Sequence, residues 1–131
     1  MSNAPTVLMN LVPLVRATCQ SATDATATTI TPDDSGTLFV DRSTSAHTYT
    51  LPAVADCKGK HFLFVKVGSG DMVIAGGTTD KMVAFNDAAA DSVAFSTASE
   101  KIGGAMLIIG DGDYYYAFNI SAGANTVTVA T

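Results

Sequence analysis

The sequence predicts an all-β protein: a single compact β-sandwich with a jelly-roll-like arrangement and an extended N-terminal arm. Two observations carry this prediction. Apolar and polar residues alternate in several short segments, which is the pattern of strands with one buried face. No segment repeats apolar residues every three to four positions over the length of a helix. A chain of 131 residues is also the usual size of one domain.

The alternation is clearest in residues 47–51 (HTYTL), where Tyr49 and Leu51 share one face of the predicted strand. Pro52 ends that strand because it has no N–H to donate to a ladder. Residues 61–67 (HFLFVKV) are apolar on both faces, so we expect this strand in the middle of the fold.

Further strands are expected after these two, to give about eight to ten in all. They are residues 71–75, 81–85, 92–96, 105–109, 114–120 and 126–130. The turn at residues 110–113 (GDGD) joins two of them as a hairpin, because Asp-Gly pairs accept the positive φ of tight turns. Only residues 86–91 offer even one weak helical turn.

Residues 1–30 are predicted to form an N-terminal arm and tether, and residues 31–131 the β-sandwich domain. Residues 17–31 are small, polar and rich in Thr, whereas the segment before them is apolar. The predicted partner-binding residues of this arm are Val7, Leu8, Met9, Leu11, Val12, Leu14 and Val15. The alternative is that these residues fold back as an ordinary edge strand of the same domain.

The charge pattern argues against nucleic acid as a partner. Seven Lys and Arg stand against twelve Asp and Glu, and the basic residues form no cluster. The apolar segment of the arm has no basic residue before it and is interrupted by Pro5 and Pro13, so we expect neither a secretory signal nor a membrane anchor. Two unpatterned cysteines, Cys19 and Cys57, predict reduced thiols in a protein made in a cytoplasm.

No residue pattern points to catalysis, a metal or a cofactor, and we predict none. His47 and His61 lie in predicted strands without the spacing of a metal site. Asp111 and Asp113 fit turn chemistry better than a calcium loop. Glu100 is the only Glu, which leaves a glycoside hydrolase without an evident carboxylate pair.

Three consecutive tyrosines, Tyr114, Tyr115 and Tyr116, are the one aromatic concentration. On a strand, Tyr114, Tyr116 and Phe118 face one way and Tyr115 the other. Core packing is one interpretation, and a subunit interface is the other, because tyrosine is enriched where proteins meet.

Four short motifs in order carry a resemblance to a known group of proteins. They are residues 34–40 (DSGTLFV), 48–53 (TYTLPA), 59–64 (GKHFLF) and 110–115 (GDGDYY). Together, over residues 31–120, they resemble the head decoration (cement) proteins of tailed bacteriophages, and they are similar also to β-rich modules of tail fibres.

The resemblance implies a non-enzymatic protein of the virion, made in the host cytoplasm and bound to the outer capsid surface. It further implies a homotrimer that binds the major capsid protein and stabilises the shell, with no contact with nucleic acid or membrane. The alternative is a tail-fibre or receptor-binding β-module of a phage virion.

Overall fold

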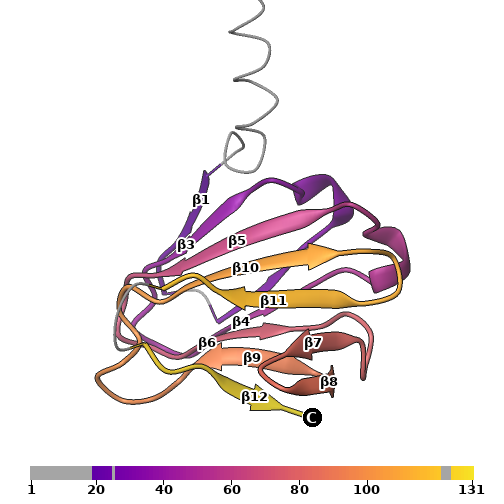
Figure 1. Ribbon diagram of the computed structural model, residues 1–131. Helices are drawn as coiled ribbons and strands as arrows, with labels where there is room; N and C mark the ends of the chain where they lie inside the picture. The colour runs from indigo at the N-terminus through magenta and orange to yellow at the C-terminus, as the bar shows by residue number, and fades with distance from the viewer. Residues whose placement is uncertain (1–18, 25, 122–124) are drawn as a thin grey trace, which may run out of the picture.

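The fold is a sandwich of two β-sheets (Figure 1), as the sequence predicts. The computed structural model describes residues 19–24, 26–121 and 125–131. The predicted partner-binding residues of the arm, Val7 to Val15, lie outside these ranges. In the described residues there are twelve strands and two short 3-10 helices, η1 (Pro32–Asp34) and η2 (Val54–Asp56).

The first sheet has seven strands in the order β1-β3-β5-β10-β11-β7-β8. Their bounds are β1 Cys19–Ala22, β3 Leu38–Asp41, β5 His61–Lys66, β10 Ala105–Gly110, β11 Tyr115–Asn119, β7 Met82–Ala84 and β8 Asp87–Ala90. The second sheet has five strands in the order β12-β9-β6-β4-β2. Their bounds are β12 Thr128–Ala130, β9 Ser92–Phe95, β6 Met72–Ala75, β4 His47–Thr50 and β2 Ala27–Thr29.

Both sheets are mixed. The parallel pairs are β1 with β3, β3 with β5, β11 with β7, β2 with β4 and β4 with β6. The other ladders between the described strands are antiparallel. A jelly roll is built from antiparallel strands, so the pairing of this sandwich differs from that arrangement.

Part of the predicted tether belongs to the sandwich. Cys19–Ala22 forms β1 at the edge of the seven-stranded sheet, and Ala27–Thr29 forms β2 at the edge of the five-stranded sheet. Neither segment alternates apolar and polar residues, because both are short edge strands with largely exposed side chains. The boundary predicted at residue 30 therefore cuts off one edge strand of each sheet.

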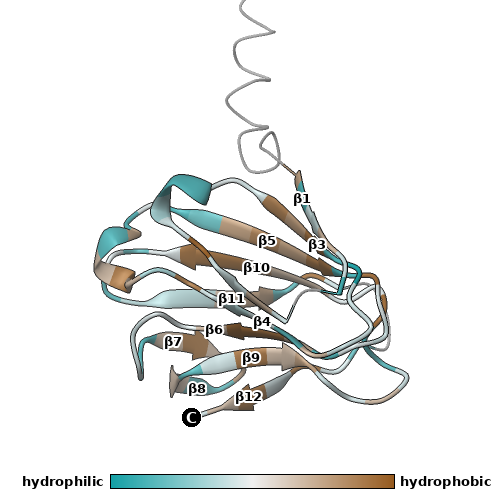
Figure 2. Ribbon diagram, turned by 180° about the vertical axis from the view of Figure 1, so that it is seen from behind, coloured by the Kyte–Doolittle hydropathy of each residue, from teal (hydrophilic) through white to brown (hydrophobic). Residues whose placement is uncertain are grey.

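The core lies between the sheets and is rich in aromatic rings. Phe39 and Phe64 of the seven-stranded sheet stack with ring centroids 5.1 Å apart, and Tyr49 of the opposite sheet meets Phe64 edge-on, also at 5.1 Å. Figure 2 shows that hydrophobic residues recur along strands of both sheets, for example in β6. Such packed rings contribute beyond their buried area, by about 0.5–1.5 kcal/mol a pair.

Two turns test the local predictions. The hairpin at residues 110–113 is confirmed: it joins β10 and β11, and Gly112 has a φ of 94°. Residues 86–91, the one range with even a weak helical pattern, form no helix, because β8 occupies most of that range. Phe85 and Asn86 have φ values of 49° and 72°, and two successive positive φ values turn the chain tightly into a β7–β8 hairpin.

A buried polar network joins the two sheets at one end of the sandwich. The side chains of Asp41 (β3), Lys66 (β5) and His47 (β4) are all 0% exposed. Lys66 Nζ donates to Asp41 Oδ2 at 3.0 Å and to the Ser43 carbonyl at 2.9 Å. The other carboxylate oxygen, Oδ1, lies 3.2 Å from His47 Nδ1 and accepts from the Ser43 N–H at 3.0 Å.

The carboxylate of Asp41 is held ionised within this network. Burial works to raise the pKa of Asp41, but hydrogen bonds from the Ser43 backbone, Lys66, His47 and the Ser43 hydroxyl together hold it below its usual value. The negative charge of Asp41 and the positive charge of Lys66 therefore offset one another inside the protein.

Replacing Lys66 with methionine should lower the free energy of unfolding by about 3–5 kcal/mol, because a buried carboxylate loses its counter-charge. Denaturant unfolding measures the loss. The matched control is Lys101→Met, because Lys101 pairs with Asp71 at the surface, where its side chain is 17% exposed and that of Asp71 40%. That change should cost at most about 1 kcal/mol. Equal losses in the two variants would contradict the structural role of the network.

Stability should also fall at low pH through Asp41. Its pKa is lower in the folded protein than the value of about 3.9 for an unfolded aspartate. The unfolded chain therefore binds more protons, so the stability contributed by Asp41 is complete above the unfolded pKa and is lost as the pH falls through the folded pKa. Unfolding free energies measured from neutral pH downward should fall less steeply in Asp41→Asn than in the original protein. The same slope in both would rule out this contribution.

Candidate functional site

The outward side of the seven-stranded sheet carries mainly apolar side chains over four adjacent strands, with His61 at the start of β5 as a polar exception. We call this surface the outer face and define it by eight side chains: Leu38, Val40, Leu63, Val65, Leu107, Ile109, Tyr116 and Phe118. They alternate with buried core residues along β3, β5, β10 and β11, and each is at least partly exposed. None carries a charge, so the outer face is suited to contact with another apolar surface.

The strand registers make the outer face continuous. Leu63 of β5 lies opposite Leu38 of β3 on one side and Leu107 of β10 on the other. Leu107 in turn lies opposite Phe118 of β11, which is 50% exposed. Paired residues on one face of a sheet have Cβ atoms about 4.5–5.5 Å apart, so this row forms one band across four strands.

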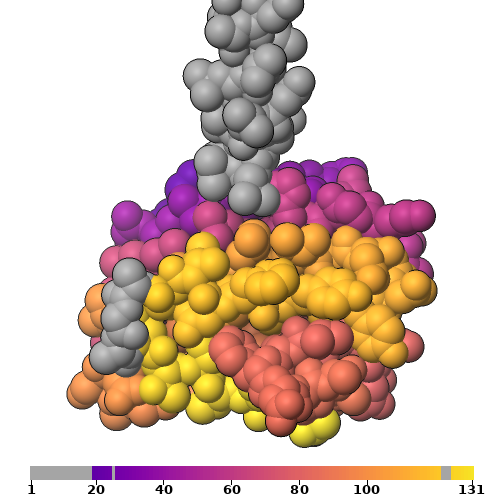
Figure 3. Space-filling view, in the orientation of Figure 1, coloured from indigo at the N-terminus to yellow at the C-terminus, as the bar shows by residue number. Residues whose placement is uncertain are grey.

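The outer face includes one side of a strand that the sequence singles out. Residues 61–67 are apolar on both faces and are expected in the middle of the fold. The strand β5 is indeed central in its sheet, but only Phe62, Phe64 and Lys66 point into the core, and Leu63 and Val65 stay partly exposed. In Figure 3 the surface over β10 and β11, in orange and yellow, fills the centre of the view. All of the described strands belong to the two sheets, so none of them forms a further layer over the outer face.

The three tyrosines divide between core and surface as the strand alternation predicts. Tyr115 is fully buried, and its hydroxyl donates to the Pro52 carbonyl at 2.6 Å. Tyr116 points outward and belongs to the outer face, whereas Tyr114 lies beneath the Lys81 ammonium group, which is 4.8 Å from the ring centroid. Core packing is therefore the role of Tyr115, and only its two neighbours are placed for a contact surface.

The hairpin beside these tyrosines is fixed by Asp111. Its Oδ1 accepts the N–H groups of Asp113 and Tyr114 at 2.8 and 2.7 Å, and its Oδ2 accepts the Tyr116 hydroxyl at 2.7 Å. The Tyr116 hydroxyl and these backbone donors hold the pKa of Asp111 below its usual value, and the same bond raises the pKa of Tyr116. The carboxylate serves the turn, as expected from the sequence, and it anchors one corner of the outer face.

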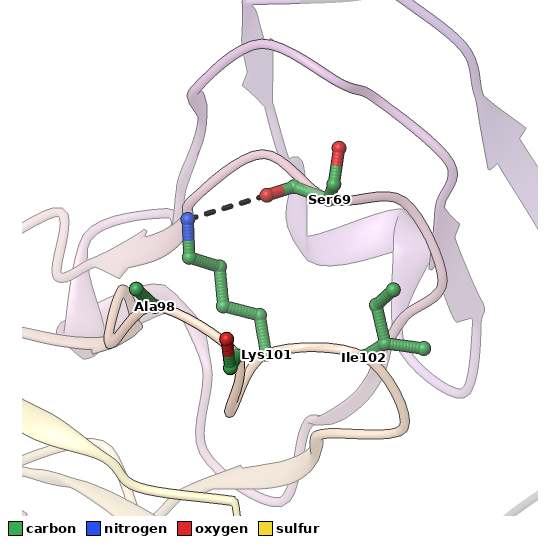
Figure 4. Close-up of a pocket in the computed structure, with 5 residues that line it drawn as sticks. Ser69, Ala98, Lys101 and Ile102 are labelled. Atoms are coloured by element: carbon green, nitrogen blue, oxygen red, sulfur yellow. Dashed lines mark hydrogen bonds between the residues drawn. The ribbon is translucent and has the colours of Figure 1, made fainter.

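Two hollows lie away from the outer face. One, of about 400 Å³, is formed by loop residues Ser69, Ala98, Ser99, Lys101 and Ile102 (Figure 4). The Lys101 side chain extends across this hollow, and its Nζ donates to the Ser69 carbonyl at 3.2 Å. The other, of about 330 Å³, opens between the edge strands β1 and β2, and Thr28, Phe39 and Tyr49 are among its lining residues.

The second hollow adjoins a chain of hydrogen bonds that sequence reasoning missed. Thr28 Oγ1 lies 2.8 Å from His47 Nε2, and His47 Nδ1 lies 3.2 Å from Asp41 Oδ1. Nδ1 donates to the ionised carboxylate, which has no proton to give, and Nε2 shares a hydrogen bond with the Thr28 hydroxyl. Hydroxyl, imidazole and carboxylate follow in the order of a hydrolase triad.

The surroundings of the Thr28, His47 and Asp41 hydrogen bonds indicate that these bonds hold the two sheets together. The His47 ring is 0% exposed and stacks on Tyr49, with ring centroids 4.2 Å apart, and Asp41 is shared with Lys66. A substrate in the hollow can meet the Thr28 hydroxyl but not the imidazole. No local sequence pattern could have revealed the chain, because its three residues come from three different strands.

The other candidate residues have structural surroundings. His61 lies on β5, and its buried Nε2 has no hydrogen-bond partner. Cys19 is exposed and Cys57 is buried, and both are free thiols. Among the described residues, no three His, Cys, Asp or Glu side chains are grouped to hold a metal ion. No helix in the described ranges is long and apolar enough to cross a membrane.

Replacing Tyr116 with phenylalanine should raise the pKa of Asp111 toward the usual aspartate value, because the carboxylate loses the hydroxyl bond that lowers it most. An NMR titration of the Asp111 carboxyl carbon measures this shift. Tyr114→Phe is the control, since Asp111 accepts the backbone N–H of Tyr114 and not its hydroxyl. An unchanged Asp111 titration in Tyr116→Phe would show that the bond does not persist in solution.

Comparisons of the chain with protein-family models, with curated proteins and with solved structures found no match.

Proposed function

We propose that this chain is a non-enzymatic structural protein that decorates the outside of a phage capsid by binding the major capsid protein. The observation that supports the proposal most is the outer face, an uncharged apolar surface across four strands of a folded domain. Surfaces of this kind mark sites of protein contact, and aromatic residues at their centre or rim contribute most to binding.

The charge of the molecule supports a protein partner over a nucleic acid. The formal net charge is -5, and the outer face contains no Lys or Arg. A phosphate backbone would therefore find no positive surface there. On the outside of a shell, such a protein meets the capsid subunits and not the genome.

The stiffness of the domain also suits attachment to a lattice. The two sheets are joined by the Asp41 network and by the aromatic core, so the outer face is held on a rigid support. A preorganised surface loses less conformational entropy on binding than a mobile one. Homotrimer formation on the capsid belongs to the proposal through the sequence resemblance, and light scattering of the purified chain tests it.

The binding test uses heads of the encoding phage prepared without this protein. The full chain should sediment with these heads, and Phe118→Lys should bind about tenfold or more weakly, because the contact would desolvate an unpaired charge. The control is Ile102→Lys, which changes a side chain that is 65% exposed and outside the outer face. It should bind like the original protein.

Two results would overturn the proposal. Failure of the original, folded chain to sediment with the heads would remove the capsid as partner. Binding to whole host cells in place of heads would favour the receptor-binding alternative.

A further inference from the structure

The size of the outer face restricts what can cover it. Four strands about 4.8 Å apart and about five residues of each strand give an area on the order of 350 Å². A stable contact between two folded proteins buries about 800 Å² on each partner. A short apolar segment can therefore cover most of the outer face, whereas a folded partner such as a capsid subunit would have to extend its contact beyond these eight side chains.

We propose that residues 7–15 of the same chain cover the outer face in the free protein. Seven of these nine residues are apolar, the exceptions are Asn10 and Pro13, and none is charged. An uncharged apolar segment therefore meets an uncharged apolar face, and water is removed from both. This inference rests on the proposed function in that it names what occupies the proposed capsid-binding face before attachment.

The position of β1 brings this segment to the right edge of the sheet. Cys19, the first residue of β1, is in register with Leu38, where the row Leu38, Leu63, Leu107 and Phe118 begins. Three residues, 16–18, separate Val15 from Cys19, and a fully extended chain covers about 13 Å over that step. The outer face starts about 4.8 Å from β1 and continues for about 14 Å to β11. Residues 7–15 can thus lie across it.

Attachment through β1 favours the same copy of the chain over a second copy. A connection of only a few residues gives a tethered segment an effective concentration in the millimolar range. Purified protein at micromolar concentration offers the segment of another molecule at about a thousandth of that value. The free protein would then hide its outer face and remain soluble until a capsid surface competes for it.

The experiment places a spin label in the segment and reads methyl NMR signals on the sheet. The full chain carries Asn10→Cys with Cys19→Ser, and buried Cys57 is left in place. The expected result is that the methyl signals of Leu63, Val65 and Leu107 lose most of their intensity, whereas those of Val73 on the outward side of the five-stranded sheet do not.

The matched control moves the label to Thr48→Cys, in the same Cys19→Ser background. Thr48 is in register with Val73, so the pattern should reverse: Val73 loses intensity and the outer face keeps it. A second sample mixes spin-labelled protein without isotope with isotope-labelled protein without the spin label. No loss is expected there.

Intensity loss at the outer face in the mixed sample as well as in the first would assign the segment to a second copy and overturn the proposal. Full intensity at the outer face in both samples would also overturn it. Neither result depends on capsids. The spin-label experiment can therefore contradict cover by residues 7–15 while the full chain still sediments with heads. It can equally support that cover while sedimentation with heads fails.

Discussion

The carboxylate of Asp41 is the constraint on which this sandwich depends at one end. It is fully buried, and its partners come from both sheets: Lys66 from a neighbouring strand and His47 from the opposite layer. A buried charge without these partners would be costly, so strand register, sheet separation and the loop through Ser43 must all agree. The network fixes how the two sheets sit on each other, a task that apolar packing alone performs less specifically.

With the sheets fixed in this way, each central strand of the larger sheet has one side in the core and the other directed outward. Leu63 and Leu107 then become neighbours on the outward side, far from the residues that shield Phe62 and Phe64. A domain whose solvent side is this apolar has a surface suited to cover by a further chain segment or a partner. The proposed decoration of a capsid and the proposed cover by residues 7–15 are two uses of that one surface.

The hydrogen bonds among Thr28, His47 and Asp41 have the geometry of a hydrolase triad but a structural role. The distances alone would fit a nucleophile, a base and an orienting carboxylate. Burial of the imidazole against Tyr49 and the ion pair of Asp41 with Lys66 give the chain a structural role, because a base must be reachable by the proton that it removes. The burial of His47 and the ion pair of Asp41, more than the distances, distinguish a structural role from a catalytic one.

The sequence by itself determined the fold class, most strands and the Asp111 turn, because these depend on alternation and on residues close together in the chain. It also contained a signal of the outer face, since residues 61–67 are apolar on both sides, although that pattern by itself indicated only a strand in the middle of the fold. Only the tertiary structure decided that β1 and β2 are edge strands, that parallel pairs occur in both sheets, and that Asp41 meets Lys66 and His47. Those features depend on which strands pair and in what register, and pairing joins residues far apart in sequence that no local pattern relates.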